Sequence, residues 1–316
     1  MLTQMRIVRN KYILAWGYAC LLASVLSGCS LLAPGEPPGG TEAAAPPVKV
    51  EPVRRMPRVG LALGGGAARG FAHVGVIQVL EHHGIRPDLV VGTSAGSLVA
   101  ALYASGQSAA TLEREALAMD EAMLTDWTMP LFGRGMLRGE ALARYVRRAV
   151  DGKLIEQMPL PLGILATDLG NGEGVLFRRG DAAQAVRASS AVPGVFVPVT
   201  IAGRDYVDGG LVAPVPVNQA RSMGAEVIIA VDISSDPQGN DANGWLKVLL
   251  QTTAIMGQSI NRQTLQAPDV IAVRPALSGV GSADFAARQR SIEAGRAAML
   301  AALPRLKAEL AKGRAP

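Results

Sequence analysis

One short stretch holds residues whose types and spacing could do covalent chemistry: Gly92-Thr93-Ser94-Ala95-Gly96. An apolar run over residues 88–91 precedes it, and a helix-forming run over 97–103 follows it. A serine on a sharp strand-to-helix turn of the form Gly-x-Ser-x-Gly presents its hydroxyl clear of the sheet. The pattern predicts that Ser94 is a nucleophile and that Gly92 and Gly96 leave room for strand and helix to approach. Alone, five residues fit an ordinary Gly/Ser turn equally well.

An activated serine needs a base that takes its proton, and in this arrangement the base is usually a histidine later in the chain. All three histidines come earlier: His73, His82 and His83. Asp208 is the best remaining candidate, because it ends a short apolar run and Gly209-Gly210 lets the backbone turn after it. A carboxylate is a weak base at neutral pH, so the role requires burial that raises the pKa of Asp208. By itself the tripeptide is also typical of a plain Asp-Gly turn.

A glycine-rich segment, Gly64-Gly65-Gly66-Ala67-Ala68-Arg69-Gly70, lies between an apolar run and a helical pattern. Unpaired amides in such a loop, with the positive end of the following helix, suit a developing oxyanion or a phosphate. The candidate oxyanion-hole residues are Gly64, Gly65, Gly66, Ala67 and Arg69, the last of which adds a positive charge. A nucleotide site with Asp88 as its ribose-binding acid is the alternative. It is disfavoured because Gly-x-Gly-x-x-Gly fails at Arg69 and no Gly-Lys-Ser/Thr follows.

Composition excludes several other classes. The chain has 316 residues, of which 49% are hydrophobic and 18% charged, which suits one large domain with tails. Its formal charge of +5 falls to about +2 if a basic N-terminal segment with Arg6, Arg9 and Lys11 is removed. With 4% aromatic residues it also lacks stacking surfaces, so nucleic acid is not an expected partner.

The N-terminus has the three parts of a secretory signal. A basic start precedes an apolar stretch over residues 12–26 that is too short for a spanning helix, and small residues follow. Leu26-Ser27-Gly28-Cys29 resembles the lipobox of bacterial lipoproteins, which implies cleavage before Cys29 and lipidation of its thiol. The alternatives are an ordinary signal with a chance cysteine, or an anchor that is not cleaved.

Three segments are therefore expected: a lipoprotein signal over 1–28, a lipidated cysteine with a Pro/Gly-rich disordered tether over 29–57, and a hydrolase domain over 58–316. The lipid anchor would hold the domain on a membrane of the bacterial cell envelope. Serine after Cys29 favours the outer membrane, facing the periplasm. Because Cys20 leaves with the signal, the mature domain would have no disulfide.

Alternating apolar runs and helical patterns predict an α/β fold with a mostly parallel central sheet and helices on both faces. Strands are expected over residues 59–63, 88–91, 162–167, 174–177, 205–207, 226–231 and 269–273. Helices are expected over 71–80, 182–189 and 284–312. Between 112 and 158 we expect an inserted helical layer that is interrupted at 129–135.

Together the three motifs resemble the patatin-like phospholipases, in the bacterial branch similar to neuropathy target esterase. The resemblance also covers Thr167-Asp168-Leu169 and residues 186–196 and 224–227. It implies a three-layer α/β fold, a Ser-Asp dyad of Ser94 and Asp208, an oxyanion hole of amides around 65–67, and no metal or cofactor. The glycine-rich loop departs from the strict patatin spacing by one residue, which leaves the individual oxyanion donors open.

The expected function is a serine acyl hydrolase of the phospholipase or lysophospholipase type, which releases fatty acid from membrane lipid esters. A lipoprotein that binds lipid in the same pocket without enzymatic activity is the alternative. The sequence does not distinguish phospholipid, lysophospholipid and neutral ester substrates, because the acyl pocket depends on how residues 112–158 fold over Ser94.

Overall fold

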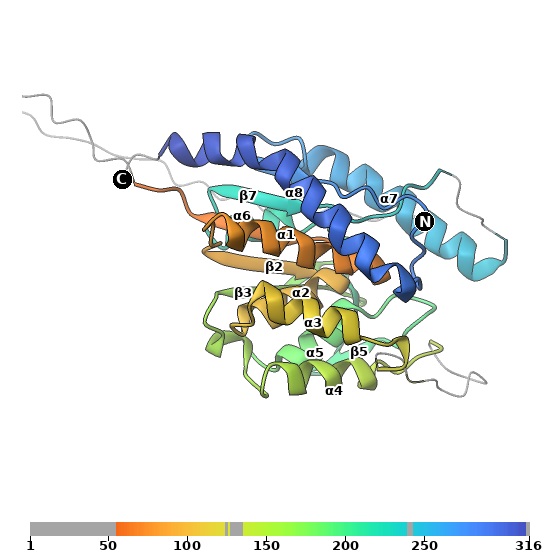
Figure 1. The fold of residues 1–316 in the computed structure, drawn as a ribbon. Helices are drawn as coiled ribbons and strands as arrows, with labels where there is room; N and C mark the ends of the chain where they lie inside the picture. Colours follow the sequence, from red (N-terminus) through yellow and green to blue (C-terminus); the bar gives the residue numbers. More distant parts are fainter. Residues whose placement is uncertain (1–54, 124–125, 127–134, 239–242, 314–316) are drawn as a thin grey trace, which may run out of the picture. The chain divides into compact units, whose positions relative to one another are not determined.

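The computed structural model describes residues 55–123, 126, 135–238 and 243–313, which form one α/β unit around an eight-stranded sheet (Figure 1). The strand order is β5-β6-β3-β2-β1-β7-β8, and β4 pairs with β3 beside this path. The strands are β1 (Val59–Leu63), β2 (Leu89–Thr93), β3 (Leu162–Asp168), β4 (Gly174–Phe177), β5 (Val199–Ile201), β6 (Arg204–Asp208), β7 (Val227–Val231) and β8 (Val270–Val273). The helices are α1 (Phe71–His82), α2 (Ala95–Ala104), α3 (Ala109–Ala118), α4 (Glu140–Ala149), α5 (Ala182–Ser189), α6 (Val217–Ser222), α7 (Trp245–Thr264) and α8 (Arg288–Ala311).

Five neighbouring strands, β3-β2-β1-β7-β8, pair in parallel, while β4 and β6 pair antiparallel to β3. Every residue of β1, β2, β3 and β7 is buried, as expected for parallel strands that are covered on both faces. The carboxyl ends of β1 and β2 lie side by side, because Leu63 pairs with Gly92. The glycine-rich loop and the Ser94 turn therefore start at the same edge of the sheet.

Alternate residues of the strands enter two different cores. Leu61 and Leu63 pack with α1, α2 and α8 on one face, which Figure 1 shows in front of the sheet. Ala62 packs with α6 on the other face. The predicted three-layer α/β fold with a mostly parallel sheet is confirmed.

Several elements differ from the expectation. The short strand β5 and the helices α6 and α7 were not predicted, and α8 starts at Arg288 rather than at residue 284. Helices α3 and α4 occupy part of the expected layer over 112–158, and most of its expected interruption lies outside the described residues. None of the described helices is both long and apolar enough to cross a membrane.

The predicted signal, Cys29 and nearly all of the predicted tether also lie outside the described residues. The first described residue, Arg55, already contacts the folded unit: its guanidinium forms two hydrogen bonds with the Glu226 carboxylate, at 2.7 and 2.8 Å. The backbone amide of Arg58 donates to the same carboxylate at 2.8 Å. Residues 55–58 are thus held beside the start of β7.

Helix α8 packs closely on α1 through two glycines. A Cβ atom at Gly75 would overlap the carbonyl oxygen of Ile292, and one at Gly295 would overlap that of Ala72. Neither obstacle is a flexible side chain, so the backbones would have to move apart. Since α1 directly follows the glycine-rich loop, this contact fixes one wall of the site.

We expect Gly75→Ala to lower the free energy of unfolding by about 1–3 kcal/mol, because the added methyl group forces the two helices apart. Gly281→Ala is the matched control, since a Cβ there would have only the Asp284 side chain within 4 Å, at 3.8 Å. Urea unfolding followed by circular dichroism measures both. Equal stability of the two variants would contradict the proposed close contact.

Candidate active site

Ser94 lies at the turn between β2 and α2 in a conformation that serine rarely adopts, with φ 53° and ψ −124°. Two glycines make the turn possible. A Cβ at Gly92 would overlap the start of α2, and one at Gly96 would overlap the carbonyl oxygen of Leu63. A positive φ at a non-glycine residue costs about 1–3 kcal/mol, so neighbouring contacts must hold this turn in place.

Two other serines supply those contacts. The backbone amide of Ser94 donates to the hydroxyl of Ser189 at 2.9 Å, and that hydroxyl donates to the carbonyl oxygen of Leu165 at 2.6 Å. The hydroxyl of Ser97 donates to the carbonyl oxygen of Ser94 at 2.6 Å. Ser189 and Ser97 are both fully buried. Ser189 was not predicted as a site residue, because it lies 95 residues from Ser94 and only the fold brings the two together.

Asp208 ends β6 and lies opposite Ala166 of β3. Its backbone is tied on both sides: its amide donates to the carbonyl of Ala191 at 3.0 Å, and its carbonyl accepts from Thr167 Oγ1 at 2.9 Å. Its carboxylate Oδ1 accepts from the amide of Gly210 at 2.7 Å. The side chain is therefore fixed in a buried position.

Burial raises the pKa of Asp208 to about 6, because the charged form loses contact with water. A hydrogen bond from the Ser94 side chain and the bond from the Gly210 amide favour the charged form and limit the rise. The structure thus brings the two predicted dyad residues together, and it gives Asp208 the raised pKa that a general base needs. At neutral pH most of this carboxyl is ionised and can accept a proton.

The glycine-rich loop lies against the same turn, since a Cβ at Gly65 would be 3.1 Å from Cβ of Ser94. Several of its amides are already occupied. The amide of Gly64 donates to Val231 and that of Gly65 to Pro214, at 3.0 and 2.9 Å, and the amide of Arg69 donates back to Gly66 at 3.2 Å. In the described part of the chain, the amides of Gly66 and Ala67 donate to no acceptor. Of the five predicted oxyanion residues, these two have amides available for an oxyanion.

Arg69 is directed elsewhere. Its Nε donates to the carbonyl of Ile233 at 2.9 Å and its Nη1 to that of Val280 at 3.4 Å. The side chain is largely buried, and this burial lowers the pKa of the guanidinium, while the nearby Asp232 raises it. Arg69 does not line the cavity at Ser94. Its guanidinium instead connects the glycine-rich loop to the carbonyls of Ile233 and Val280.

His73 is fully buried and contacts the backbone of the glycine-rich loop through its ring. Its Nε2 lies 2.8 Å from the carbonyl oxygen of Gly64, to which the neutral ring can donate. Burial lowers its pKa to about 4, so the ring is uncharged at neutral pH. His82 and His83 lie at the far end of α1, beyond the reach of Ser94.

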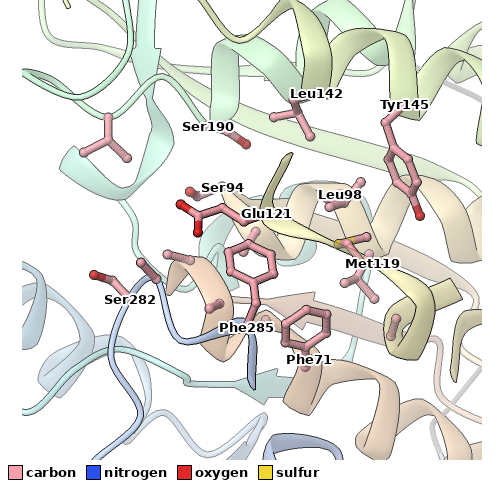
Figure 2. Close-up of a pocket in the computed structure, with 18 of the residues that line it drawn as sticks. Phe71, Ser94, Leu98, Met119, Glu121, Leu142, Tyr145, Ser190, Ser282 and Phe285 are labelled. Carbon is pink, nitrogen blue, oxygen red and sulfur yellow. The ribbon is translucent and has the colours of Figure 1, made fainter. Parts of the chain in front are cut away.

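Ser94 opens into an apolar cavity of about 330 Å³ (Figure 2). Aliphatic and aromatic side chains from α1, α2, α3 and α4 line most of it, with Phe71, Leu98, Leu112 and Leu142 among them. Besides Ser94, the polar residues on its wall are Glu121, Ser190, Ser282 and the pair Tyr145 and Glu115, in which the Tyr145 hydroxyl donates to the Glu115 carboxylate at 3.1 Å. The lining suits a hydrocarbon chain.

The described residues contain no cluster of metal ligands, and Asp88 lies away from the glycine-rich loop. Among the described residues, no group of three or more His, Cys, Asp or Glu side chains could hold a metal ion. Asp88, the alternative ribose-binding acid, accepts a hydrogen bond from the amide of Val59 at 2.6 Å. Because Val59 starts β1 and the glycine-rich loop follows its other end, Asp88 lies away from the loop.

A family model and several curated proteins match the sequence of this chain. A family model described as patatin-like phospholipase matches residues 61–221, about half of the chain. An uncharacterized NTE family protein of Mycobacterium tuberculosis is 35% identical over 207 residues, which cover 63% of this chain and 58% of that protein. The patatin-like phospholipase domain-containing protein 6 of Homo sapiens is 35% identical over 201 residues, which cover 59% of this chain and 14% of that protein.

Among solved structures, VipD from Legionella pneumophila has a TM-score of 0.51 at 15% identity, with 80% of this chain and 68% of that chain covered. That likeness concerns the fold alone. The relatives above extend well beyond the part they share with this chain, which spans only 58% of the mycobacterial protein. The match of the family model over half of the sequence shows that the chain belongs to the patatin-like phospholipase family.

Proposed function

We propose that the chain is a lipid-ester hydrolase of the serine type, in which Ser94 is the nucleophile and Asp208 its base. One observation carries the proposal: a strained serine and a buried carboxyl with a pKa near 6 meet at the wall of an apolar cavity. Membership of the patatin-like phospholipase family supports a lipid ester as the substrate.

The first half of the reaction transfers the acyl group to the enzyme. Asp208 takes the proton from Ser94 Oγ, which attacks the ester carbonyl carbon. The oxyanion that forms accepts hydrogen bonds from the amides of Gly66 and Ala67, which have no other acceptor in the described part of the chain. The intermediate collapses, the carbon–oxygen bond to the alcohol breaks, and the alcohol takes the proton from Asp208.

The second half releases the fatty acid. Asp208 takes a proton from a water molecule, whose oxygen attacks the acyl carbon of the ester on Ser94. The same two amides hold the new oxyanion, and its collapse returns the proton to Ser94 Oγ. One carboxyl serves as base in both halves, so no histidine is required.

The acyl chain of the substrate would occupy the apolar cavity. Phospholipids, lysophospholipids and neutral esters all carry such a chain, so the cavity favours long acyl esters as a class. We further propose that Cys29 carries a lipid anchor and that residues 30–57 tether the hydrolase domain to the periplasmic face of the outer membrane. The sequence Leu26-Ser27-Gly28-Cys29 and the Pro/Gly-rich stretch after it support this location.

Replacing either dyad residue is expected to abolish most of the activity. Ser94→Ala removes the nucleophile, and Asp208→Asn should lower kcat on p-nitrophenyl acyl esters by about 10²–10⁴-fold, the usual contribution of a general base. A fluorophosphonate probe should label the wild-type protein and leave Ser94→Ala unlabelled.

Asp205→Asn is the matched control, because Asp205 lies on the same strand and its carboxylate binds Thr200 at 2.6 Å. It should keep its activity. If Ser94→Ala and Asp208→Asn kept theirs as well, the dyad would be refuted. If the wild-type protein itself were neither active nor labelled, a lipid-binding protein without enzymatic activity would be the better description.

The pKa of about 6 for Asp208 predicts a pH profile. Below pH 6 the base is protonated, so kcat/KM should fall tenfold per pH unit as pH decreases, and above pH 7 it should be constant. The stability of the fold should change in the opposite sense. The pKa of Asp208 is higher in the folded state than the unfolded value of 3.8. Its contribution to the free energy of unfolding is therefore fully present below pH 3.8 and is lost as pH rises through 6.

Asp208→Asn should therefore be more stable than the wild-type protein well above pH 6, by up to about 3 kcal/mol, and should have no such advantage below pH 3.8. Initial rates and urea unfolding across this pH range measure the two effects. A flat rate profile from pH 5 to 8 would rule out a base with this pKa.

Ser189→Ala tests how the nucleophile is positioned. The variant leaves the amide of Ser94 and the carbonyl of Leu165 without their partner, so the strained turn should loosen. We expect kcat to fall by about ten- to a hundredfold with little change in KM. Ser105→Ala is the control, because that hydroxyl also donates to a backbone carbonyl, at 2.7 Å, but at the far end of α2. Equal kcat in the two variants would show that Ser189 does not position Ser94.

A further inference from the structure

Helix α7 exposes large apolar side chains along one side. Trp245 is 70% exposed, Val248 51%, Ile255 53% and Met256 54%. Spacings of three, seven and eight residues place all four on one face of the helix, and we call this set the α7 stripe. Trp245, Val248, Ile255 and Met256 form four of the ten large hydrophobic side chains that the described residues expose.

The opposite side of α7 is also apolar and faces the protein. Leu250 lines the cavity at Ser94. A Cβ at Gly194 would lie 3.1 Å from Leu249, 3.2 Å from Leu246 and 3.5 Å from the edge of the Trp245 ring, so the start of α7 packs on the loop after α5. That loop supplies Val192 and Val195 to the cavity wall. The stripe therefore lies on the outer side of a helix whose inner side contributes to the wall of the proposed acyl site.

The charges on α7 indicate which kind of partner fits the α7 stripe. None of its 20 residues is acidic, and its two charged residues, Lys247 and Arg262, are basic. An apolar face, cationic side chains and an exposed tryptophan are the features of helices that lie in the headgroup region of a bilayer. Anionic lipid headgroups complement such a helix, because nothing on it repels them.

We propose that the α7 stripe is the surface on which the protein docks onto an anionic lipid bilayer, with the helix lying in the plane of the headgroups. The proposal rests on the proposed function, because it makes the lipid surface the source of the substrate. A lipid at that surface would meet α7 next to the cavity, so its acyl chain could pass to Ser94 with little exposure to water. This contact is separate from any anchor at Cys29.

A local reporter tests the proposal on the full-length chain. Cys20 and Cys29 are both replaced by serine, and Val248→Cys or Leu300→Cys then carries one environment-sensitive fluorophore. Leu300 is the matched control, because it is 51% exposed but lies on α8. With vesicles of equimolar phosphatidylglycerol and phosphatidylcholine, the label at 248 should shift to the blue and resist quenching by iodide. The label at 300 should do neither.

A second arm measures hydrolysis. The variant Val248→Ser/Ile255→Ser/Met256→Ser should lose at least about tenfold of its rate on esters within vesicles, since burying a single large apolar side chain changes binding by about that factor. Its rate on a water-soluble short-chain ester should be unchanged, because none of the three side chains lines the cavity. Leu300→Ser should resemble the wild-type protein in both assays.

The outcomes are distinct. A label at 248 that stays exposed to iodide with vesicles overturns the proposal. A label that is shielded without vesicles, in a protein that elutes as a dimer, overturns it in favour of a second copy of the chain. Equal losses on vesicle and soluble esters would also overturn it, because α7 would then act only on the fold of the site. If vesicles shield the label at 248 from iodide but the wild-type protein hydrolyses neither ester, the docking surface is supported and the proposed function is wrong.

Discussion

The site depends on keeping one carboxyl group out of water. Asp208 is almost fully buried, and the burial that suits it to the proposed role of base also leaves its charged form unfavourable, by a net of about 3 kcal/mol. The Gly210 amide and the Ser94 side chain are the two groups that stabilise the charge. A closer cation would stabilise it further but would lower its pKa and weaken it as a base. The burial of Asp208 therefore lowers the free energy of unfolding at neutral pH and raises the proton affinity of its carboxyl group.

The sheet supplies the rigidity that such a base requires. Leu165 of β3 is a common support, because its carbonyl accepts from Ser189 and lies so close to Gly209 that a Cβ there would overlap it. One strand thus positions Ser94, the proposed nucleophile, through Ser189 and Asp208, the proposed base, through the turn after β6. Because parallel strands end at one edge, the strained turn at Ser94 and the glycine-rich loop reach this point as well.

The sequence predicted what is local. Fully buried strands produce continuous apolar runs, and the turn at Ser94 needs glycines at fixed offsets, so both are visible in the residues themselves. The oxyanion donors were not predictable to the residue. Which amides remain available depends on the carbonyls of Pro214 and Val231, which lie about 150 residues or more along the chain from the loop. The placement of the Arg69 side chain was not predictable for the same reason, since the carbonyls of Ile233 and Val280 hold it.

Helix α7 was missed because apolar residues lie on both of its sides, which removes the single apolar face that identifies a surface helix. The inner side of α7 packs against the segment that holds the glycine-rich loop. Gly257 lets α7 approach Pro214 closely. The carbonyl of Pro214 accepts a hydrogen bond from the amide of Gly65, which lies beside Ser94. A helix that both braces the glycine-rich loop and exposes tryptophan to the outside cannot satisfy a simple amphipathic pattern. The weak pattern is thus a consequence of two neighbours, the glycine-rich loop on the inner side and the proposed lipid surface on the outer side.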